Sequence, residues 1–411
     1  MTLVIYFSKS PLSKQQRTVQ NHILSFINID KEVVFYNMFP HFKIKNYLIN
    51  QNFNFIVFHY TFLALSVTDP KILLRVGKKL SNLKGIKIAF PQDEYTNSNT
   101  LCEFFKLTNT DKIFTLLNKI DFEKVYPKHK SGVSKIFTVL PGYVSENDLK
   151  YIKKKPKNKT IDISYRSRKT SPWLGKHSFL KWMIAEKFKK VKLKNLKIDI
   201  SVSDNDRISG DDWLDFLCKS RTVLGVEGGS SIHDPDGVLQ YDYESYLKNE
   251  NPKISHHEYY NMFLKKYEGN LNLKCLTPRI FEAIMCKCCL VLVEGNYSGI
   301  LKKDINYIPV NKDFSNIDEV LNKICDKSYC DEIVNRNYKM IIKDKKYSYK
   351  SFIDYVVKVC KIKQSKMNFS NYFKNYHLVN NFSNNLLVLI YYYAEKLMLL
   401  KLLRIIKTRI K

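Results

Sequence analysis

Short apolar runs alternate with polar segments of helical periodicity over the first 150 residues of the chain. Each apolar run is typical of a buried strand, and the polar segment that follows it is typical of a helix. This alternation indicates βαβ units, which build a parallel sheet. The expected strands cover residues 3–7, 33–36, 53–59, 86–90, 112–116 and 135–139, and an expected helix covers 14–26.

A second series of the same kind follows a basic, proline-broken connection at 151–159, which we interpret as the interdomain linker. Because 411 residues exceed one typical core, we predict an α/β domain over 1–150, a second over 151–365, and a connector and tail over 366–411. The expected later strands cover 160–165, 222–226, 289–293 and 307–309, with helices near 177, from 278, and over 317–325 and 347–359.

The stretch 277–301 carries the clearest candidate chemistry. Thr277 is a suitable N-cap and Pro278 a favoured first helical residue, so a helix should start here. Its free N–H groups, its dipole and Arg279 together make an anion site. Glu282 lies one turn deeper on the same face. The strand expected at 289–293 should end in a loop at its carboxyl end, where open α/β sheets bind ligands. A ligand with both phosphate and a diol, such as a sugar nucleotide, suits these groups.

Here the chain resembles the group 1 (family 4) glycosyltransferases, through Phe281-Glu282-Ala283. The resemblance implies a GT-B architecture, two Rossmann-like domains facing a cleft, with Glu282 against the donor ribose. Two positions depart from the family pattern: Lys287 stands where a Gly is usual, and Lys274 where a second Glu is usual. The alternative is an ordinary amphipathic helix before a core strand.

The same resemblance assigns the donor diphosphate to basic residues of the second domain. Arg166 or Arg168, together with Lys176, would neutralise it, although a simple basic loop is the alternative. Charged donors suit a leaving diphosphate that gains negative charge. The sequences Asp204-Asn205-Asp206 and Asp234-Pro235-Asp236 match a metal-binding D-x-D pattern. Because cations are available, we expect no metal and no cofactor beyond the donor substrate.

Glu227-Gly228-Gly229 follows the apolar run 222–226, and its glycines would let a ligand approach the backbone closely. Glu227 would replace the missing upstream Glu of the family if residues from about 232 to 273 form an insertion.

Three residues of the first domain are candidate contacts for the sugar or the acceptor. His59 follows an apolar run directly, and by the resemblance it would reach toward the donor sugar; a locally satisfied loop histidine is the alternative. Asp93 or Glu94 would accept a proton from the acceptor hydroxyl if burial raises its pKa, unless it is a solvated loop acid.

Charge and cysteine content restrict the partners and the compartment. Lys and Arg number 68 against 39 Asp and Glu, a formal charge of +29 that suits a polyanionic partner. The nine cysteines lack a disulfide pattern, and no secretory leader precedes the first strand, so we expect free thiols in a cytoplasmic protein. Cys286-Lys287-Cys288-Cys289 has the wrong spacing for zinc.

Residues 386–411 form a basic amphipathic pattern that fits an interfacial helix on an anionic membrane surface, with packing on the protein itself as the alternative. The sequence thus predicts a metal-independent, hexosyltransferase-type glycosyltransferase, peripheral on the inner face of the cell membrane. It would act on a saccharide or lipid-linked acceptor in bacterial surface polysaccharide or lipopolysaccharide synthesis, with no nucleic acid expected. The alternatives are a basic nucleic-acid-binding protein and a noncatalytic sugar-nucleotide-binding assembly protein.

Overall fold

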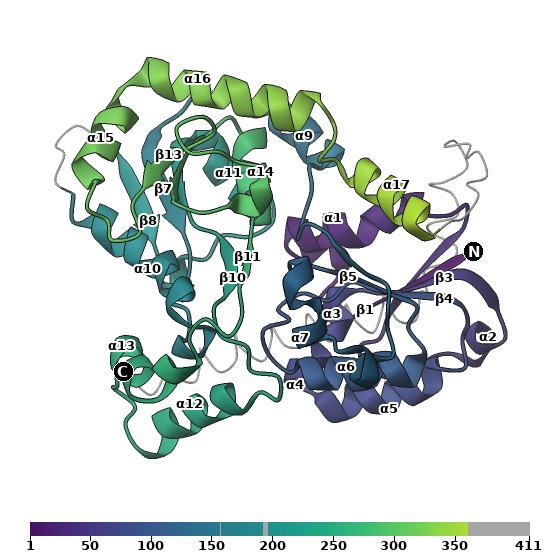
Figure 1. Cartoon of the computed structure of the whole chain (residues 1–411). Helices are drawn as coiled ribbons and strands as arrows, with labels where there is room; N and C mark the ends of the chain where they lie inside the picture. Colours follow the sequence, from purple (N-terminus) through teal and green to yellow (C-terminus); the bar gives the residue numbers. More distant parts are fainter. Residues whose placement is uncertain (157, 192–195, 361–411) are drawn as a thin grey trace, which may run out of the picture.

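Two parallel sheets, one in each half of the chain, organise the protein (Figure 1). The computed structural model describes residues 1–156, 158–191 and 196–360. The expected α/β fold with two Rossmann-like domains is confirmed. The predicted connector and helical tail, 366–411, lie outside the described residues.

The first sheet has the strand order β2-β1-β3-β4-β5-β6, and neighbouring strands are parallel. Its central strands are apolar throughout because both faces are covered. In β1, Leu3 and Ile5 face one core while Val4 and Tyr6 face the other. The strands are β1 (Thr2–Tyr6), β2 (Val33–Asn37), β3 (Asn52–Phe58), β4 (Lys84–Ala89), β5 (Lys112–Thr115) and β6 (Ile136–Thr138).

Helices cover both faces of this sheet. α5 (Pro70–Leu80) and α6 (Ser98–Thr108) pack on one face. α1 (Arg17–Ser25) and α17 (Tyr349–Cys360) pack on the other. By chain position α17 belongs to 151–365, yet its apolar side chains pack on the first sheet. Shorter helices are α2 (Asn46–Ile49), α3 (Tyr60–Leu63), α4 (Leu65–Thr68), α7 (Phe122–Val125) and α8 (Lys128–Ser131).

The second sheet has the order β13-β12-β9-β7-β8 and is also parallel. Residues of β12 alternate between two cores, which α10, α15 and α16 cover on one side and α11 and α14 on the other. Its strands are β7 (Ile161–Arg166), β8 (Ile198–Ser201), β9 (Ser220–Gly225), β12 (Cys289–Val293) and β13 (Ile308–Val310). The helices are α10 (Lys176–Lys189), α11 (Asp211–Lys219), α14 (Pro278–Met285), α15 (Ile317–Cys325) and α16 (Lys327–Asn337).

A helical insertion leaves the second domain between two short antiparallel strands, β10 (Gly228–Ser230) and β11 (Leu273–Cys275). It contains α12 (Val238–Asn249), α13 (His256–Tyr259) and a π-helical turn, Tyr260–Leu264. Aromatic side chains, among them Phe179 and Trp182 of α10, form its core. In Figure 1 it lies beneath the second domain and beside the first.

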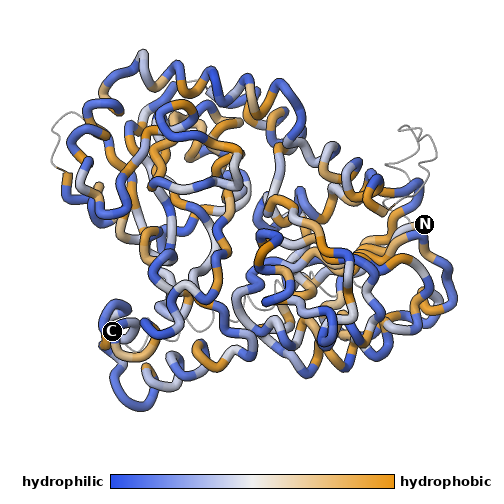
Figure 2. Tube along the Cα trace, viewed as in Figure 1, coloured by the Kyte–Doolittle hydropathy of each residue, from blue (hydrophilic) through white to orange (hydrophobic). Residues whose placement is uncertain are grey.

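The segment predicted as the interdomain linker is partly helical, because α9 (Glu146–Lys153) covers its start. Lys155 then pairs with Asp215 of the second domain, with a Nζ–Oδ1 distance of 2.8 Å. Figure 2 shows hydrophobic residues along the strands and hydrophilic residues over the outer helices. Among the described helices, none has the length and apolarity to cross a membrane.

Candidate functional site

The start of α14 and the end of β7 bring the second domain's candidate residues together. α14 begins at Pro278 as predicted, although the Thr277 side chain makes no capping hydrogen bond. Arg279 reaches back from the first turn and donates a hydrogen bond from Nη1 to the backbone carbonyl of Arg166. Its guanidinium lies 5.1 Å from the ring centre of Trp213 on α11. The end of β7 is therefore tied directly to the first turn of α14.

Glu282 lies beneath this contact and is 6% exposed. The indole N–H of Trp213 donates to Oε2 over 2.6 Å. The hydroxyl of Thr18, on α1 of the first domain, donates to Oε1 over 2.9 Å. Burial raises the pKa of Glu282, and the two hydrogen bonds and Arg279 oppose that rise. Two protein donors thus fix the carboxylate, and a carboxylate can accept about four hydrogen bonds in all.

Arg166, one of the two expected phosphate ligands, is engaged within its own domain. Its Nη2 forms an ion pair with Oδ1 of Asp199 over 2.7 Å, and its guanidinium lies 4.6 Å from the ring centre of Phe216. Arg168, two residues further on, is exposed. The structure therefore separates the two arginines: Arg166 stabilises the end of the sheet, and Arg168 is free to meet an anion.

Lys181 joins this group, although the sequence analysis did not single it out. It lies on α10 and is partly buried. Burial lowers its pKa, and the nearby charges of Arg168 and Arg279 lower it further, while the carboxylate of Asp93 acts in the opposite direction. Three cations from separate elements thus share one region of the second domain. A buried cation that faces like charges is costly unless an anion joins it.

The first domain contributes Asp93 to the same region. Asp93 follows β4, is exposed, and has a left-handed backbone with φ of 58°. Its neighbour Tyr95 lies against Trp173 of the second domain, with ring centres 5.9 Å apart. Burial and then Asp93 raise the pKa of Tyr95, whereas Arg168 lowers it. The charged groups of the two domains therefore act on one another here.

Glu94 points the other way, into the first domain. It is fully buried and accepts hydrogen bonds from the hydroxyls of Thr115 and Tyr126 and from the amide of Leu116. Burial raises its pKa to about 7. Of the two candidate acids, Glu94 is therefore enclosed in the first domain with a raised pKa, and Asp93 is the solvent-exposed one.

His59 is placed at the end of β3, as expected, but it is fully buried. Its Nε2 lies 3.0 Å from Nδ1 of His22, and its Nδ1 accepts from the amide of Thr61. Burial, and then His22, hold the pKa of His59 well below its usual value. The ring nitrogens are therefore satisfied inside the first domain, which corresponds to the alternative considered for this residue.

Lys176 and Glu227 face the insertion and the loop after β12. The Lys176 amide donates to Glu268 over 3.0 Å, and its ammonium lies 5.7 Å from the Tyr260 ring centre. Glu227 is 4% exposed and accepts from the amide of Tyr297 over 2.7 Å. Its carboxylate fixes the loop that follows β12.

Gly228 and Gly229 are explained by the hairpin that begins the insertion. Gly229 has φ of 109°, and a Cβ there would lie 1.8 Å from the carbonyl oxygen of Leu273. A Cβ on Gly228 would lie 3.1 Å from Thr277. The close approach expected of these glycines is therefore to β11 and to the start of α14.

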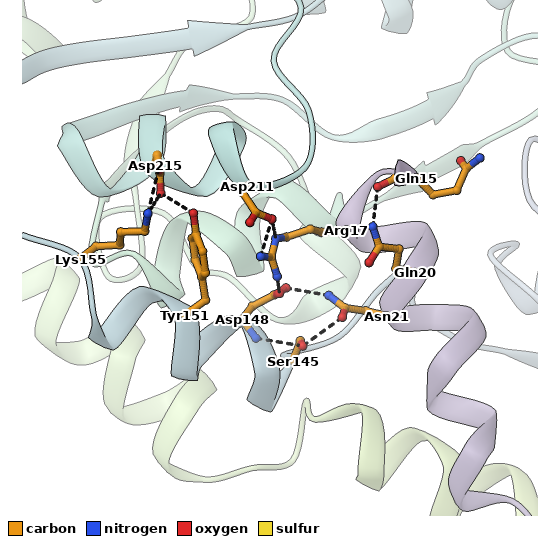
Figure 3. A network of polar contacts seen from close by, with 10 residues as sticks. All are labelled: Gln15, Arg17, Gln20, Asn21, Ser145, Asp148, Tyr151, Lys155, Asp211 and Asp215. Carbon is orange, nitrogen blue, oxygen red and sulfur yellow. Dashed lines mark hydrogen bonds and ion pairs between the residues drawn. The ribbon is translucent and has the colours of Figure 1, made fainter. Parts of the chain in front are cut away.

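A polar network ties the first helix of the chain to the second domain (Figure 3). Arg17 of α1 pairs with Asp148 of α9, with a Nη1–Oδ1 distance of 2.6 Å, and also with Asp211 of α11. Asn21 donates to the other oxygen of Asp148 over 2.6 Å. Asp148 is 1% exposed, so this ion pair is largely shielded from solvent.

The insertion also connects the two domains. The amide of Asp234 donates to the carbonyl of Tyr95 over 2.7 Å, and the amide of Asn97 donates to the carbonyl of Asp234 over 2.9 Å. The Ser98 hydroxyl lies 2.8 Å from Nε2 of His233. The loop that carries Asp93 is thus held by the insertion.

Over the residues that the structure describes, no group of three or more His, Cys, Asp or Glu side chains could hold a metal ion. Asp206 accepts from Ser201, and Asp236 accepts from Asn99. All nine cysteines are free.

The sequence matches no protein-family model and no curated protein. The structure is similar to T4 phage beta-glucosyltransferase in complex with UDP-glucose, with a TM-score of 0.51 at 12% identity over 88% of this chain and 100% of that one. An alpha-glucosyltransferase in complex with UDP and a 13-mer DNA containing a HMU base gives a TM-score of 0.51 at 13% identity, also over 88% and 100%. These likenesses show that the protein has the GT-B fold.

Proposed function

We propose that the protein is a glycosyltransferase that moves a sugar from a nucleotide-diphosphate donor to an acceptor hydroxyl. The observation that carries this proposal is the convergence of Arg168, Lys181 and Arg279 where β7 ends and α14 begins: Arg279 hydrogen-bonds the carbonyl of Arg166, two residues before Arg168, and the charges of Arg168, Arg279 and Asp93 all act on Lys181. A leaving diphosphate gains negative charge in the transition state, and prepositioned cations stabilise that charge. The GT-B fold supports the proposal, because the similar solved structures are glucosyltransferases with bound UDP-glucose or UDP.

In this proposal the second domain holds the donor. Glu282 orients the ribose hydroxyls with the accepting capacity that Thr18 and Trp213 leave unused. Arg168, Lys181 and Arg279 hold the diphosphate, with Lys176 as an outer cation. The diphosphate then needs no metal. One of the similar structures is T4 phage beta-glucosyltransferase with UDP and Mn²⁺, so the need for a metal is a point to test.

The first domain is proposed to hold the acceptor. Asp93 is the candidate general base, because its carboxylate is exposed and its charge acts on Lys181, one of the cations proposed to bind the leaving group. Glu94 and His59 support the loops on which the acceptor would rest, since both are buried and hydrogen-bonded.

The proposed acceptor is a saccharide or a lipid-linked saccharide in bacterial surface polysaccharide or lipopolysaccharide synthesis, handled by a hexosyltransferase of the group 1 (family 4) type. This assignment rests on the Phe281-Glu282-Ala283 resemblance and on the basic amphipathic pattern of 386–411. Residues 386–411 would hold the enzyme on the inner face of the cell membrane, near such an acceptor.

A second candidate acceptor is DNA. Two observations favour it: the formal charge of +29, and the DNA bound to one of the glucosyltransferases of similar fold. A DNA acceptor would make binding fall steeply as salt rises, because bound cations on the duplex are released.

A donor screen followed by a turnover assay tests these proposals. Thermal shift with a panel of nucleotide sugars should reveal one that raises the melting temperature, because that ligand binds the native state. Release of the nucleoside diphosphate is then measured with saccharide acceptors and with duplex DNA. Turnover with a saccharide supports the first candidate, and turnover with DNA supports the second. Donor binding without turnover on any acceptor would indicate a noncatalytic binder, and no donor binding would contradict the proposal.

A further inference from the structure

A pocket of about 550 Å³ lies on the first domain, away from the proposed donor site. It is placed where β5 and β6 begin and where α17 ends. Asp93 instead follows the carboxyl end of β4 in the same parallel sheet. The pocket therefore lies where the strands of that sheet begin, whereas Asp93, the first-domain residue nearest the proposed donor site, lies where they end. The pocket is lined by Lys112, Lys135, Phe137, Tyr355, Lys358, Val359 and Cys360.

Three lysines give the pocket its charge. Lys112 is only 9% exposed, whereas Lys135 and Lys358 are exposed at the rim. Within the described part of the chain, the side-chain ammonium groups of these three lysines form no hydrogen bond and no ion pair with another side chain. The nearby carboxylate of Asp111 is exposed and accepts the backbone amide of Lys87 over 2.8 Å. An anion bound among the three ammonium groups would form charge-assisted hydrogen bonds with them and gain favourable Coulomb energy.

The rest of the wall is apolar. Phe137 and Val359 are half-buried, and Tyr355 is 41% exposed although its ring centre lies only 6.5 Å from that of Phe114. The pocket thus combines cations with an aromatic and aliphatic surface. That combination suits a ligand with a charged group at one end and hydrocarbon at the other.

We propose that this pocket binds the phosphate headgroup and the adjoining carbons of an anionic phospholipid. The three ammonium groups would contact the phosphate, and Phe137, Tyr355 and Val359 would contact the glycerol and the first acyl carbons. The pocket thereby attaches the first domain to a membrane surface through its own residues. This inference does not depend on the proposed catalytic activity.

The chain's own tail is a poorer occupant. Residues 361–411 follow Cys360 directly, but Glu395 is their only acidic residue and they contain many Lys and Arg. Three lysines in the pocket would repel such a segment. A phospholipid supplies the negative charge that the tail lacks.

The first test uses a water-soluble lipid and the full chain. Dihexanoyl-phosphatidylglycerol, below its micelle concentration, should raise the melting temperature of the wild type. Lys135→Gln/Lys358→Gln should weaken this lipid binding roughly 30-fold, because each cation near an anionic lipid contributes an approximately fivefold effect. Both side chains are exposed, so the variant should fold. Lys71→Gln/Lys78→Gln removes the same charge from the exposed face of α5 and should bind the lipid like the wild type.

Controls with other ligands separate the sources of phosphate. Inorganic phosphate that stabilises the protein as well as the lipid does would overturn the lipid assignment in favour of a free phosphate site. Equal loss of lipid binding in the two double variants, or no stabilisation of the wild type, would overturn the proposal. Nucleotide-sugar binding should be the same in all three proteins. Its loss in Lys135→Gln/Lys358→Gln would instead assign the pocket to the donor site.

Discussion

The hydroxyl of Thr18 donates a 2.9 Å hydrogen bond to Oε1 of Glu282, and this bond joins the first helix of the chain to α14 of the second domain. Trp213 holds the other oxygen over 2.6 Å. The position of the Glu282 carboxylate therefore depends on how the two domains are placed. The affinity for a donor that binds Glu282 would therefore depend on the relative placement of the two domains.

Glu282→Gln should weaken donor binding while the protein stays folded. The substitution removes the charge and one accepting oxygen, and hydrogen bonds to charged groups contribute about 1.5–3 kcal/mol. Isothermal titration with the donor found by thermal shift measures the loss. Thr18→Val is the matched variant: it removes one donor to Glu282 and should cost about 1 kcal/mol of stability, with a smaller effect on donor affinity. Unchanged donor affinity in folded Glu282→Gln would refute the role in ribose binding.

Lys181→Met should lower kcat/KM. The loss should correspond to about 2–4 kcal/mol of transition-state stabilisation, as for other fixed groups that stabilise developing charge. Lys187→Met is the control, because Lys187 lies on the same helix but is exposed and outside the cation group. Arg168→Ala should resemble Lys181→Met. Arg166→Gln should chiefly lower the melting temperature, since Arg166 is paired with Asp199.

Whether turnover needs a metal ion is tested by adding a chelator to the activity assay. Activity should persist in its presence if Arg168, Lys181 and Arg279 alone hold the diphosphate. Loss of turnover with chelator, restored by manganese, would show that a metal takes part and would redirect attention to the two D-x-D sequences.

The buried Glu94 should make stability depend on pH. Burial raises its pKa from 4.5 to about 7. As pH rises through this window, the unfolded chain loses the proton while the folded protein keeps it, so the free energy of unfolding falls. Glu94→Gln cannot ionise and should lack this fall. Between pH 4.5 and 7 the wild type should therefore lose, relative to Glu94→Gln, on the order of 3 kcal/mol.

Denaturant unfolding at several pH values measures this difference. Burial lowers the pKa of His22 to about 3 and holds that of His59 well below its usual value, so both histidines destabilise the protein as pH falls below about 6.5. The change in stability due to the two histidines is opposite in sign to that due to Glu94. It is the same in the wild type and in Glu94→Gln, so it cancels when the two proteins are compared. Parallel pH curves for wild type and Glu94→Gln would show that Glu94 is not a source of pH dependence.

Deletion of residues 386–411 should release part of the protein from anionic vesicles, because only the pocket of the first domain then binds the lipid, while turnover of a soluble acceptor analogue persists. Several cations near an anionic surface, each worth about 1 kcal/mol, would otherwise contribute to reversible attachment. Sedimentation with phosphatidylglycerol vesicles measures the release. A truncated protein that still sediments fully would assign attachment to another surface, and one that unfolds would show that the tail is part of the core.

Much of the fold could be predicted from the sequence because a parallel strand covered on both faces must be apolar throughout. The run Cys289–Val293 is such a strand, and its bounds as β12 were predicted without error. The start of α14 at Pro278 was also predicted, because proline is favoured at the first helical position, although the Thr277 side chain does not form the expected cap. α17 was predicted as a helix, but no local signal showed that it would pack on the sheet of the other domain.

The candidate site was less predictable, because its members meet only through tertiary structure. Thr18 and Trp213 lie far from Glu282 in the chain, and neither belongs to a motif. Lys181 is one of many lysines on α10 and α9, and only the packing of α10 brings it near Arg168 and Arg279. Similarly, His59 is buried against His22 of α1, and the sequence pattern of β3 alone does not reveal that contact.

The hairpin of β10 and β11 makes the insertion a segment whose sequence and length can change without altering the rest of the second domain. Gly228 lies opposite Cys275, so the segment between β10 and β11 leaves and returns at adjacent points of the chain. Its length and sequence can change while the distance between those points stays the same, and longer loops add little closure entropy. Because the segment holds the backbone of Tyr95, beside Asp93, such changes would reshape the side proposed for the acceptor. Changes in the insertion would then alter the acceptor preference while the donor preference stays the same.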